Sequence, residues 1–301
     1  MKKLFFLMIL TFACALGAFA QLSLPRASQR QEVTQTVGDT RISIVYHRPN
    51  VNKREMWGCQ AKNVVPKANY EEPCLVPSGQ VWRVGANENT TFEVTNEVKI
   101  NGQTLPAGKY GLHMIPGDGE WTVIFNKVNN EWGSFKYDEK QDQLRVKVKT
   151  QTVGDLQETM SLNFENVKPT MTDIAVRWEK VRVPFTVDVG DMNARVLTYI
   201  REQLKSVKAD DFRSPMDGAN YVYNNKLTAN YPEAITWLDA LIARREAPGA
   251  FALKANLLAD SGKTAEAIAA AEKALQLAST MNPKPNTAAL EKKLAEWKAK
   301  K

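Results

Sequence analysis

The stretch that decides the fold of the first part of the chain is residues 98–105, which read VKINGQTL. Two short alternating runs flank Asn101-Gly102, and this dipeptide supplies the positive φ angles that a two-residue hairpin loop needs. The same period of two recurs in LRVKVK at 144–149 and in IAVRW at 174–178. Short alternating segments, separated by turn residues and not by helices, predict an antiparallel all-β sandwich or barrel over residues 21–190.

A helical period replaces this alternation near Gly190. Segments rich in Ala and Leu predict helices over residues 191–207, 234–245, 250–261 and 264–280. Glu-Ala-Ile at 233–235 returns at 266–268, and the pattern from Phe251 to Leu275 resembles a tetratricopeptide repeat, with Lys254 in place of the usual Leu. Residues 191–301 are therefore expected to form an α-helical, tetratricopeptide-like region that binds a protein partner.

Composition and charge exclude several classes of protein. The chain has 301 residues, of which 44% are hydrophobic, so it can bury a core in each of two domains. The formal net charge is +7, but five lysines lie in the last ten residues and the body is nearly neutral. A neutral body offers no basic stripe for nucleic acid. The sequence contains no phosphate-cradling loop, nucleophile elbow or zinc-binding histidine pair, and we expect no cofactor.

The first 20 residues predict export. Two lysines precede an apolar run from Leu4 to Leu16, and Ala18-Phe19-Ala20 follows, which is the pattern of a cleavable signal peptide. Cys14 suggests a lipoprotein instead, but Thr11 stands where a lipoprotein signal has an aliphatic residue. We therefore expect a periplasmic or secreted protein with no membrane span after signal removal.

Signal removal would leave two cysteines, Cys59 and Cys74, in an oxidising compartment. The segment between them reads as a loop, so a disulfide is the economical interpretation. The alternative is a cysteine nucleophile paired with histidine. Neither cysteine has the nearby helix start or histidine that would lower a thiol pKa.

Three runs carry a specific resemblance: VWRVGANENTT at 81–91, LPAGKYGLH at 105–113 and WTVIFNK at 121–127. Together they resemble an exported bacterial family known as domain of unknown function 2911, over roughly residues 22–189. Members are mostly exported proteins of Bacteroidetes-type bacteria, often with tetratricopeptide-like tails. The resemblance implies architecture and compartment but no activity, and His47 stands where a small polar residue is expected.

Candidate binding residues gather in the loop between residues 83 and 89, with contributions from two later hairpins. They are Arg83, Asn87, Glu88, Asn89, His113 and Trp132. Loops on a rigid sandwich present binding groups, and arginine offers a planar fork for a carboxylate or phosphate. The alternative makes Gly85-Ala86-Asn87 a turn, pairs Arg83 with Glu88 and lets Asn89 cap backbone groups.

These residues favour a non-catalytic binding or assembly module for a polar or anionic small ligand or a glycan. The alternative is a hydrolase of an extracytoplasmic glycan or peptide that uses Glu88, His113 and Arg83. A hydrolase predicts one pocket in which these three side chains converge, whereas a binding module predicts that they form structural pairs.

Two further predictions concern a metal centre and the positions of the tryptophans. A metal centre would need both histidines, His47 and His113, together with Glu88; nothing in their spacing compels it, and we expect no metal. Three tryptophans on or beside alternating strands, Trp82, Trp121 and Trp178, are expected in the core, whereas Trp132 in a turn could stack on a ligand.

Overall fold

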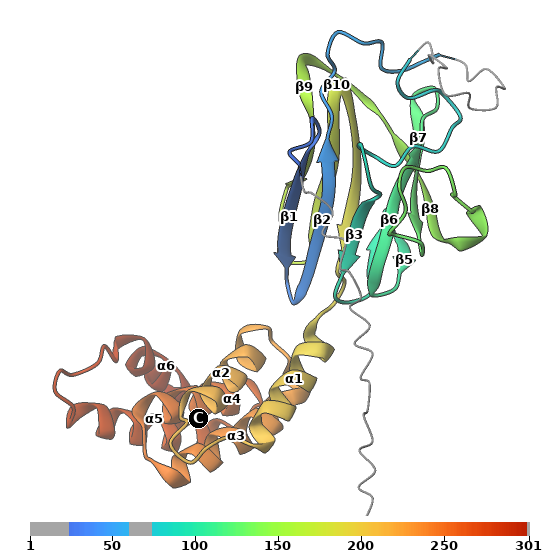
Figure 1. The fold of residues 1–301 in the computed structure, drawn as a ribbon. Coiled ribbons are helices and arrows are strands. Elements are labelled where there is room, and N and C mark those ends of the chain that lie inside the picture. Colours follow the sequence, from blue (N-terminus) through green and yellow to red (C-terminus); the bar gives the residue numbers. More distant parts are fainter. Residues whose placement is uncertain (1–23, 60–73, 300–301) are drawn as a thin grey trace, which may run out of the picture. The chain divides into compact units, whose positions relative to one another are not determined.

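The computed structural model describes residues 24–59 and 74–299. The chain divides into two compact units between Gly190 and Asp191, which we call the β unit and the helical unit (Figure 1). The predicted signal peptide, residues 1–20, lies outside the described residues. No helix among the residues that the structure describes is long and apolar enough to cross a membrane.

Two antiparallel sheets build the β unit. The six-stranded sheet has the order β1-β2-β3-β6-β7-β8 and consists of β1 (Gln29–Val37), β2 (Thr40–Arg48), β3 (Thr90–Val94), β6 (Gly108–Ile115), β7 (Glu120–Asn126) and β8 (Asp142–Lys149). The four-stranded sheet has the order β5-β4-β10-β9 and consists of β4 (Val98–Ile100), β5 (Gln103–Leu105), β9 (Gln151–Glu165) and β10 (Met171–Asp188). Both sheets contribute to one core, so the β fold is confirmed in its sandwich form (Figure 1).

Strands β4 and β5 form the hairpin that the sequence predicts. Val98 pairs with Leu105, which leaves Asn101 and Gly102 in the loop. Both loop residues have a positive φ, 46° and 84°, as a two-residue hairpin loop requires. The side-chain oxygen of Asn101 also accepts the backbone N–H of Thr186 in β10 at 2.8 Å. The turn is therefore held by its own geometry and by the neighbouring strand.

Aromatic rings from both sheets fill the core of the β unit. Phe92 in β3 lies 5.0 Å from Phe125 in β7 and 6.3 Å from Phe185 in β10, measured between ring centroids. Because β3 and β7 belong to one sheet and β10 to the other, these contacts join the two sheets.

Four tryptophans form a second cluster in this core. Trp82 stacks on Trp178 with ring centroids 5.8 Å apart and an interplanar angle of 14°. Trp57 lies edge-on to Trp82, Trp121 and Trp178 at 5.0–5.7 Å. The core positions expected for Trp82, Trp121 and Trp178 are confirmed, because all three are buried.

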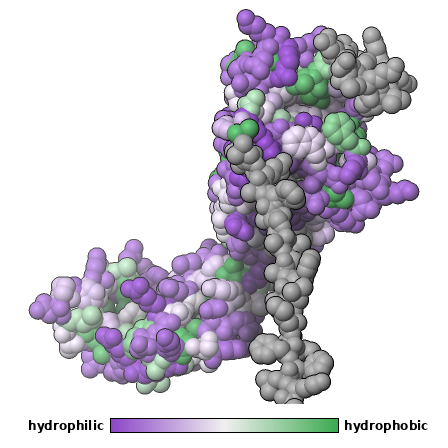
Figure 2. Space-filling model, in the orientation of Figure 1, coloured by the Kyte–Doolittle hydropathy of each residue, from purple (hydrophilic) through white to green (hydrophobic). Residues whose placement is uncertain are grey.

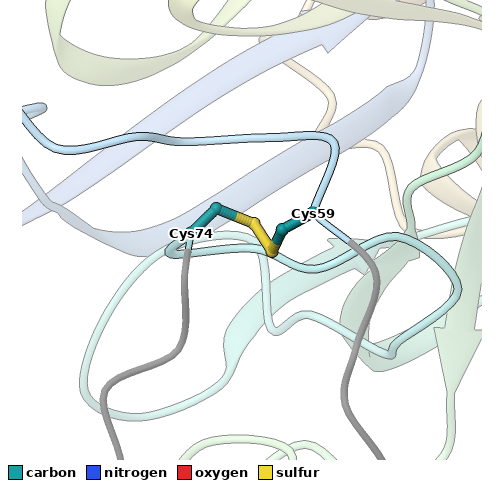
Figure 3. Close-up of a disulfide and its surroundings, with 2 residues drawn as sticks. All are labelled: Cys59 and Cys74. Carbon is teal, nitrogen blue, oxygen red and sulfur yellow. A yellow bond between two sulfur atoms is a disulfide. The ribbon is translucent and has the colours of Figure 1, made fainter.

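A disulfide joins Cys59 to Cys74, as the sequence predicts (Figure 3). The two Cα atoms are 5.8 Å apart, within the normal range for a disulfide. The backbone N–H of Ser78 donates to the carbonyl of Cys59 at 3.0 Å, so the bridge is tied to the chain that follows it. Residues 60–73 lie outside the described residues.

Six helices of the described residues make up the helical unit. They are α1 (Asn193–Lys205), α2 (Arg213–Asn224), α3 (Tyr231–Arg244), α4 (Pro248–Asp260), α5 (Thr264–Ser279) and α6 (Ala288–Ala299). The side chain of Asp191 accepts the backbone N–H of Asn193, the first residue of α1, at 2.8 Å. The sequence predicted no bounds for α2 and α6. Helix α2 contains Pro215 and Gly218, which weaken helix propensity, and Asp211 caps it through the N–H of Ser214 at 3.0 Å.

Small side chains dominate the packing in the second half of the helical unit. Ala255 of α4 and Ala267 and Ala271 of α5 are fully buried in one cluster with Leu294 of α6. A separate cluster around Leu238 of α3 joins α1 to α4. The unit therefore has a hydrophobic core of its own, and its likeness to tetratricopeptide repeats stays a prediction.

The surface in view is mostly hydrophilic. Figure 2 shows hydrophilic residues over most of the face of each unit, with apolar residues in small separate patches. The exposed aromatic side chains therefore do not form one large apolar surface. Trp132 is one of them, with 54% of its surface accessible.

Candidate functional site

The loop between residues 83 and 89 is held in a strained backbone conformation. Val84 has a φ of 56°, which is unfavourable for a β-branched residue. Gly85 has a φ of 146°, and a Cβ atom there would lie 2.7 Å from the carbonyl oxygen of His47. The hydroxyl of Thr90 donates to the carbonyl of Val84 at 2.6 Å. Strain that is held by packing and hydrogen bonds is typical of preorganised sites.

Arg83 is a half-buried cation that forms no ion pair with any residue of the described ranges 24–59 and 74–299. It lines a cavity of about 370 Å³ together with Arg54, Asn50 and Asn52. Its Nε atom is buried and has no hydrogen-bond partner among the described residues. Burial lowers the pKa of the Arg83 guanidinium. Burial is also the main reason why the pKa values of His47 and His113 are lowered, and the charge of Arg83 adds a smaller contribution in the same direction. Arg83 therefore holds positive charge next to a cavity.

Glu88 belongs to a different, neighbouring cavity of about 520 Å³. Both of its carboxylate oxygens accept hydrogen bonds from Nη1 of Arg26 at 2.7 Å. These bonds are the main reason why the pKa of Glu88 is lowered, so the carboxylate is ionised at neutral pH. The expected pair of Arg83 with Glu88 is wrong, because Glu88 pairs with Arg26, 62 residues away in the sequence.

His47 lies beside Glu88 but is not its ionic partner. Its Nε2 is 3.5 Å from Oε2 of Glu88, and burial lowers the pKa of the imidazole while Glu88 acts in the opposite direction. The ring is therefore neutral at pH 7. Its Nδ1 is buried without a partner among the described residues.

Asn89 and Asn87 fix the loop to the chain around Trp132. The Asn89 side chain donates to the carbonyl of Gly133 at 2.7 Å and accepts the N–H of Glu131 at 2.8 Å. The carbonyl of Asn87 accepts the N–H of Gly133 at 3.0 Å. Asn89 is buried and caps backbone groups, as the structural interpretation of the sequence expected.

His113 is buried and paired with a serine that the sequence reading did not single out. Nδ1 of His113 lies 3.1 Å from Oγ of Ser134, and burial lowers the pKa of the imidazole to about 4. The cavity that both residues line holds about 10 Å³, room for about one water molecule. A serine and a neutral histidine at this distance resemble a nucleophile and its base, but a substrate has no space beside them.

Four of the six predicted site residues divide among three cavities, and Asn87 and Trp132 line none of the three. Arg83 lines the cavity of about 370 Å³, Glu88 the cavity of about 520 Å³ and His113 the small one, while Asn89 lines the latter two. The exposure expected for His113 and Asn89 is wrong, because the first lies on central strand β6 and the second is clamped under the loop. The convergence that a hydrolase would need is not seen.

The two histidines do not form a common centre either. His47 faces Glu88, whereas His113 faces Ser134. Within residues 24–59 and 74–299, no group of three His, Cys, Asp or Glu side chains could hold a metal ion. Sequence reasoning did not single out Arg26, and it assigned no role to Ser134, because each lies far along the chain from its partner.

Comparison with known proteins identifies the family to which the β unit is related. No curated protein and no solved structure matches the chain. One family model, described as "Protein of unknown function (DUF2911)", matches residues 28–187, more than half of the chain. The matched range begins just before β1, ends in β10 and includes the loop from Arg83 to Asn89. The chain therefore belongs to the family of proteins of unknown function DUF2911.

Proposed function

We propose that the chain is a binding module that takes a small anionic ligand, a carboxylate or a phosphate, against Arg83. The observation that carries this proposal is a half-buried guanidinium that lines a cavity of about 370 Å³ and has no carboxylate partner in the part of the chain that the structure describes. A charge removed from water is costly unless an opposite charge or acceptors replace the lost hydration. An anion in the cavity would supply both.

The other side chains of this cavity suit an anionic ligand that also carries hydroxyl groups. Arg54 adds a second guanidinium at the exposed edge. The amides of Asn50 and Asn52 can donate to and accept from hydroxyls. A sugar acid combines the two kinds of group, so it fits this lining better than a purely apolar ligand.

Binding is favoured over hydrolysis because of the way in which the candidate residues are separated. Arg83 shares its cavity with neither Glu88 nor His113. A general acid or base must lie within hydrogen-bonding reach of the reacting group that another residue holds. The strained loop instead supports a fixed binding surface, since a preorganised site loses little entropy when it binds.

Thermal denaturation with added anions tests the proposal. The probes are inorganic phosphate, acetate and glucuronate, each compared with sodium chloride at the same ionic strength. A ligand at 100 times its Kd should add about 2.7 kcal/mol to the free energy of unfolding. Arg83→Met should abolish the shift and leave the unliganded melting temperature unchanged or higher, because it removes an uncompensated buried charge.

Arg41→Met is the matched control. Arg41 is an exposed arginine of β2 that lines neither cavity, so its loss should leave the anion-induced shift intact. Retention of the shift in Arg83→Met would contradict the proposal. So would a large fall of the unliganded melting temperature, since Arg83 would then be a structural residue.

Export is proposed together with binding. The disulfide between Cys59 and Cys74 supports it, because such bonds persist in oxidising compartments, and the pattern of residues 1–20 is that of a signal peptide. Intact-mass analysis of alkylated protein from the exported fraction should give a chain that starts at Gln21 and carries no alkyl group. Two alkyl groups without reductant would contradict the disulfide.

A further inference from the structure

A segment of the chain lies over the cavity of about 520 Å³ and places one side chain in it. Leu24, Pro25, Arg26 and Ser28 line this cavity together with Glu88. Nη1 of Arg26 bridges both carboxylate oxygens of Glu88, and the guanidinium carbon lies 5.5 Å from the ring centroid of Trp132. Arg26 thus makes the two contacts by which proteins recognise a guanidinium: a carboxylate and an aromatic face.

The two groups that receive Arg26 belong to a well-fixed part of the fold. Glu88 and Trp132 form a backbone bridge to each other, and the buried Asn89 side chain clamps the residues on either side of Trp132. Trp132 nevertheless keeps 54% of its surface accessible. A fixed carboxylate beside a fixed, exposed indole is a preorganised receptor.

Arg26, in contrast, comes from a loosely attached segment. Residues 24–28 precede β1, and no backbone–backbone hydrogen bond joins them to the other residues that the structure describes. Besides Arg26, a bond of 3.4 Å from the Asn87 side chain to the carbonyl of Ser28 holds the segment. The receptor is therefore built independently of the side chain that now fills it.

We propose that Glu88 and Trp132 form a binding site for the guanidinium group of an arginine side chain from another polypeptide, and that Arg26 of the same chain occupies it as a tethered competitor. The incoming arginine displaces residues 24–28, which also opens one wall of the cavity. The site differs from the anion site in ligand charge and does not use Arg83. Ala27 and Ser28 of the displaced segment also line the cavity of about 370 Å³, so the incoming arginine opens a wall of that cavity as well.

Other charged groups around Glu88 define the specificity. His47 is neutral at pH 7 and adds no repulsion. Arg30 and Lys109 line the same cavity, but both are exposed, and Arg30 is paired with Glu32 at 3.1 Å. A guanidinium is preferred to an ammonium because its plane can lie on the indole while its N–H groups reach the carboxylate.

Binding of a neutral-backbone arginine probe tests the site. The probe is Nα-acetyl-arginine amide, measured by calorimetry and by the indole N–H signal of Trp132 in NMR spectra. Arg26→Ala should bind the probe at least about ten-fold more tightly than the unmodified chain, because the competitor at high effective concentration is gone. Adding Glu88→Gln to Arg26→Ala should abolish this gain. The corresponding acetyl-citrulline amide should not bind, and the acetyl-lysine amide should bind more weakly.

Arg30→Ala is the matched control, because it removes one positive charge from the same cavity without touching Glu88. It should bind the probe as the unmodified chain does. The proposal is overturned if Arg26→Ala binds no more tightly than the unmodified chain, if Arg30→Ala gains as much, or if citrulline binds as well as arginine. Equal melting temperatures of the variants, required before comparison, exclude a loss of fold as the cause.

Discussion

The β unit and the helical unit keep their folds by different means. In the β unit, large aromatic rings from strands far apart in sequence meet in one core, and a disulfide closes a loop beside it. In the helical unit, Ala and Leu of neighbouring helices pack closely, and each helix contacts the next along the chain. The β unit also holds a strained Val84 next to Arg83, whose Nε has no hydrogen-bond partner among the described residues. Long-range pairing can hold unfavourable local groups in place, and that is what a binding site requires.

The largest effect is expected from the substitution Trp178→Ala. The change removes a fully buried ring that stacks on Trp82 and leaves a cavity among the tryptophans. We expect a loss of about 3–5 kcal/mol in the unfolding free energy of the β unit and none in the helical unit. Calorimetry of the full chain should show one transition displaced to lower temperature. If the transition of the helical unit also moved to lower temperature, the two units would unfold together.

Loss of the disulfide should have the next largest effect. Replacing Cys59 and Cys74 by serine opens a loop whose two ends are 15 residues apart in sequence. The chain-entropy model gives a cost of about 3 kcal/mol, again confined to the β unit. Urea unfolding followed with and without reductant measures it. Reductant should destabilise the unmodified protein and leave the double variant unaffected.

Acid should lower the stability of the β unit and not that of the helical unit, because both histidines lie in the β unit. His113 has a folded-state pKa of about 4 against 6.5 for a free imidazole, so the unfolded chain takes up the proton first. The stability that the neutral ring contributes is complete above pH 6.5 and is lost as the pH falls towards 4. At pH 5 the loss should reach about 2 kcal/mol. His47, whose pKa is also lowered, acts in the same direction.

The helical unit contains neither histidine, so its stability should not change between pH 7 and pH 5 for this reason. His113→Gln should flatten the pH dependence of the β unit over the same range. Melting curves at half-unit pH intervals provide the measurement. An unchanged slope in His113→Gln would assign the acid sensitivity to other groups.

The smallest effect is expected at an ion pair of the helical unit. Arg201 donates to both carboxylate oxygens of Glu233 at 2.8 and 2.7 Å, but both side chains are partly exposed. Solvent screening limits such a pair to about 0–1 kcal/mol, and 1 M salt should abolish the contribution. Glu233→Gln, compared at low and high salt, measures it. A larger, salt-independent loss would mean that the helical unit also depends on specific polar contacts.

Local sequence patterns predicted much of the fold for clear reasons. Strand alternation marks which face is buried, and Asn101-Gly102 defines a hairpin through its own φ angles. Helix α2 was missed because Gly218 opposes a helix locally and Pro215 is tolerated only because it lies in the first turn, which the sequence did not show. Packing overrides the preference of Gly218, which lies directly against Ile200, where a Cβ atom would be 2.8 Å from a methyl carbon.

The arrangement of the six candidate site residues could not be predicted from the sequence. Six residues were singled out because charged, amide and aromatic side chains gather around a turn. Which of them are exposed, and which carry a partner, depends on neighbours that come from elsewhere in the chain. The Asn89 side chain is hydrogen-bonded to backbone groups beside Trp132, and the His113 ring pairs with the Ser134 hydroxyl.

The sequence by itself determined the compositional class, the change from strands to helices near Gly190 and the pairing of the two cysteines, because these follow from periodicity and from the small number of thiols. Only the tertiary structure decided that Glu88 meets Arg26 and that Arg83 meets no carboxylate among the described residues. Two charged groups pair only when they lie within a few ångströms of each other in space. The folded sheets bring side chains that are far apart in the sequence to such distances.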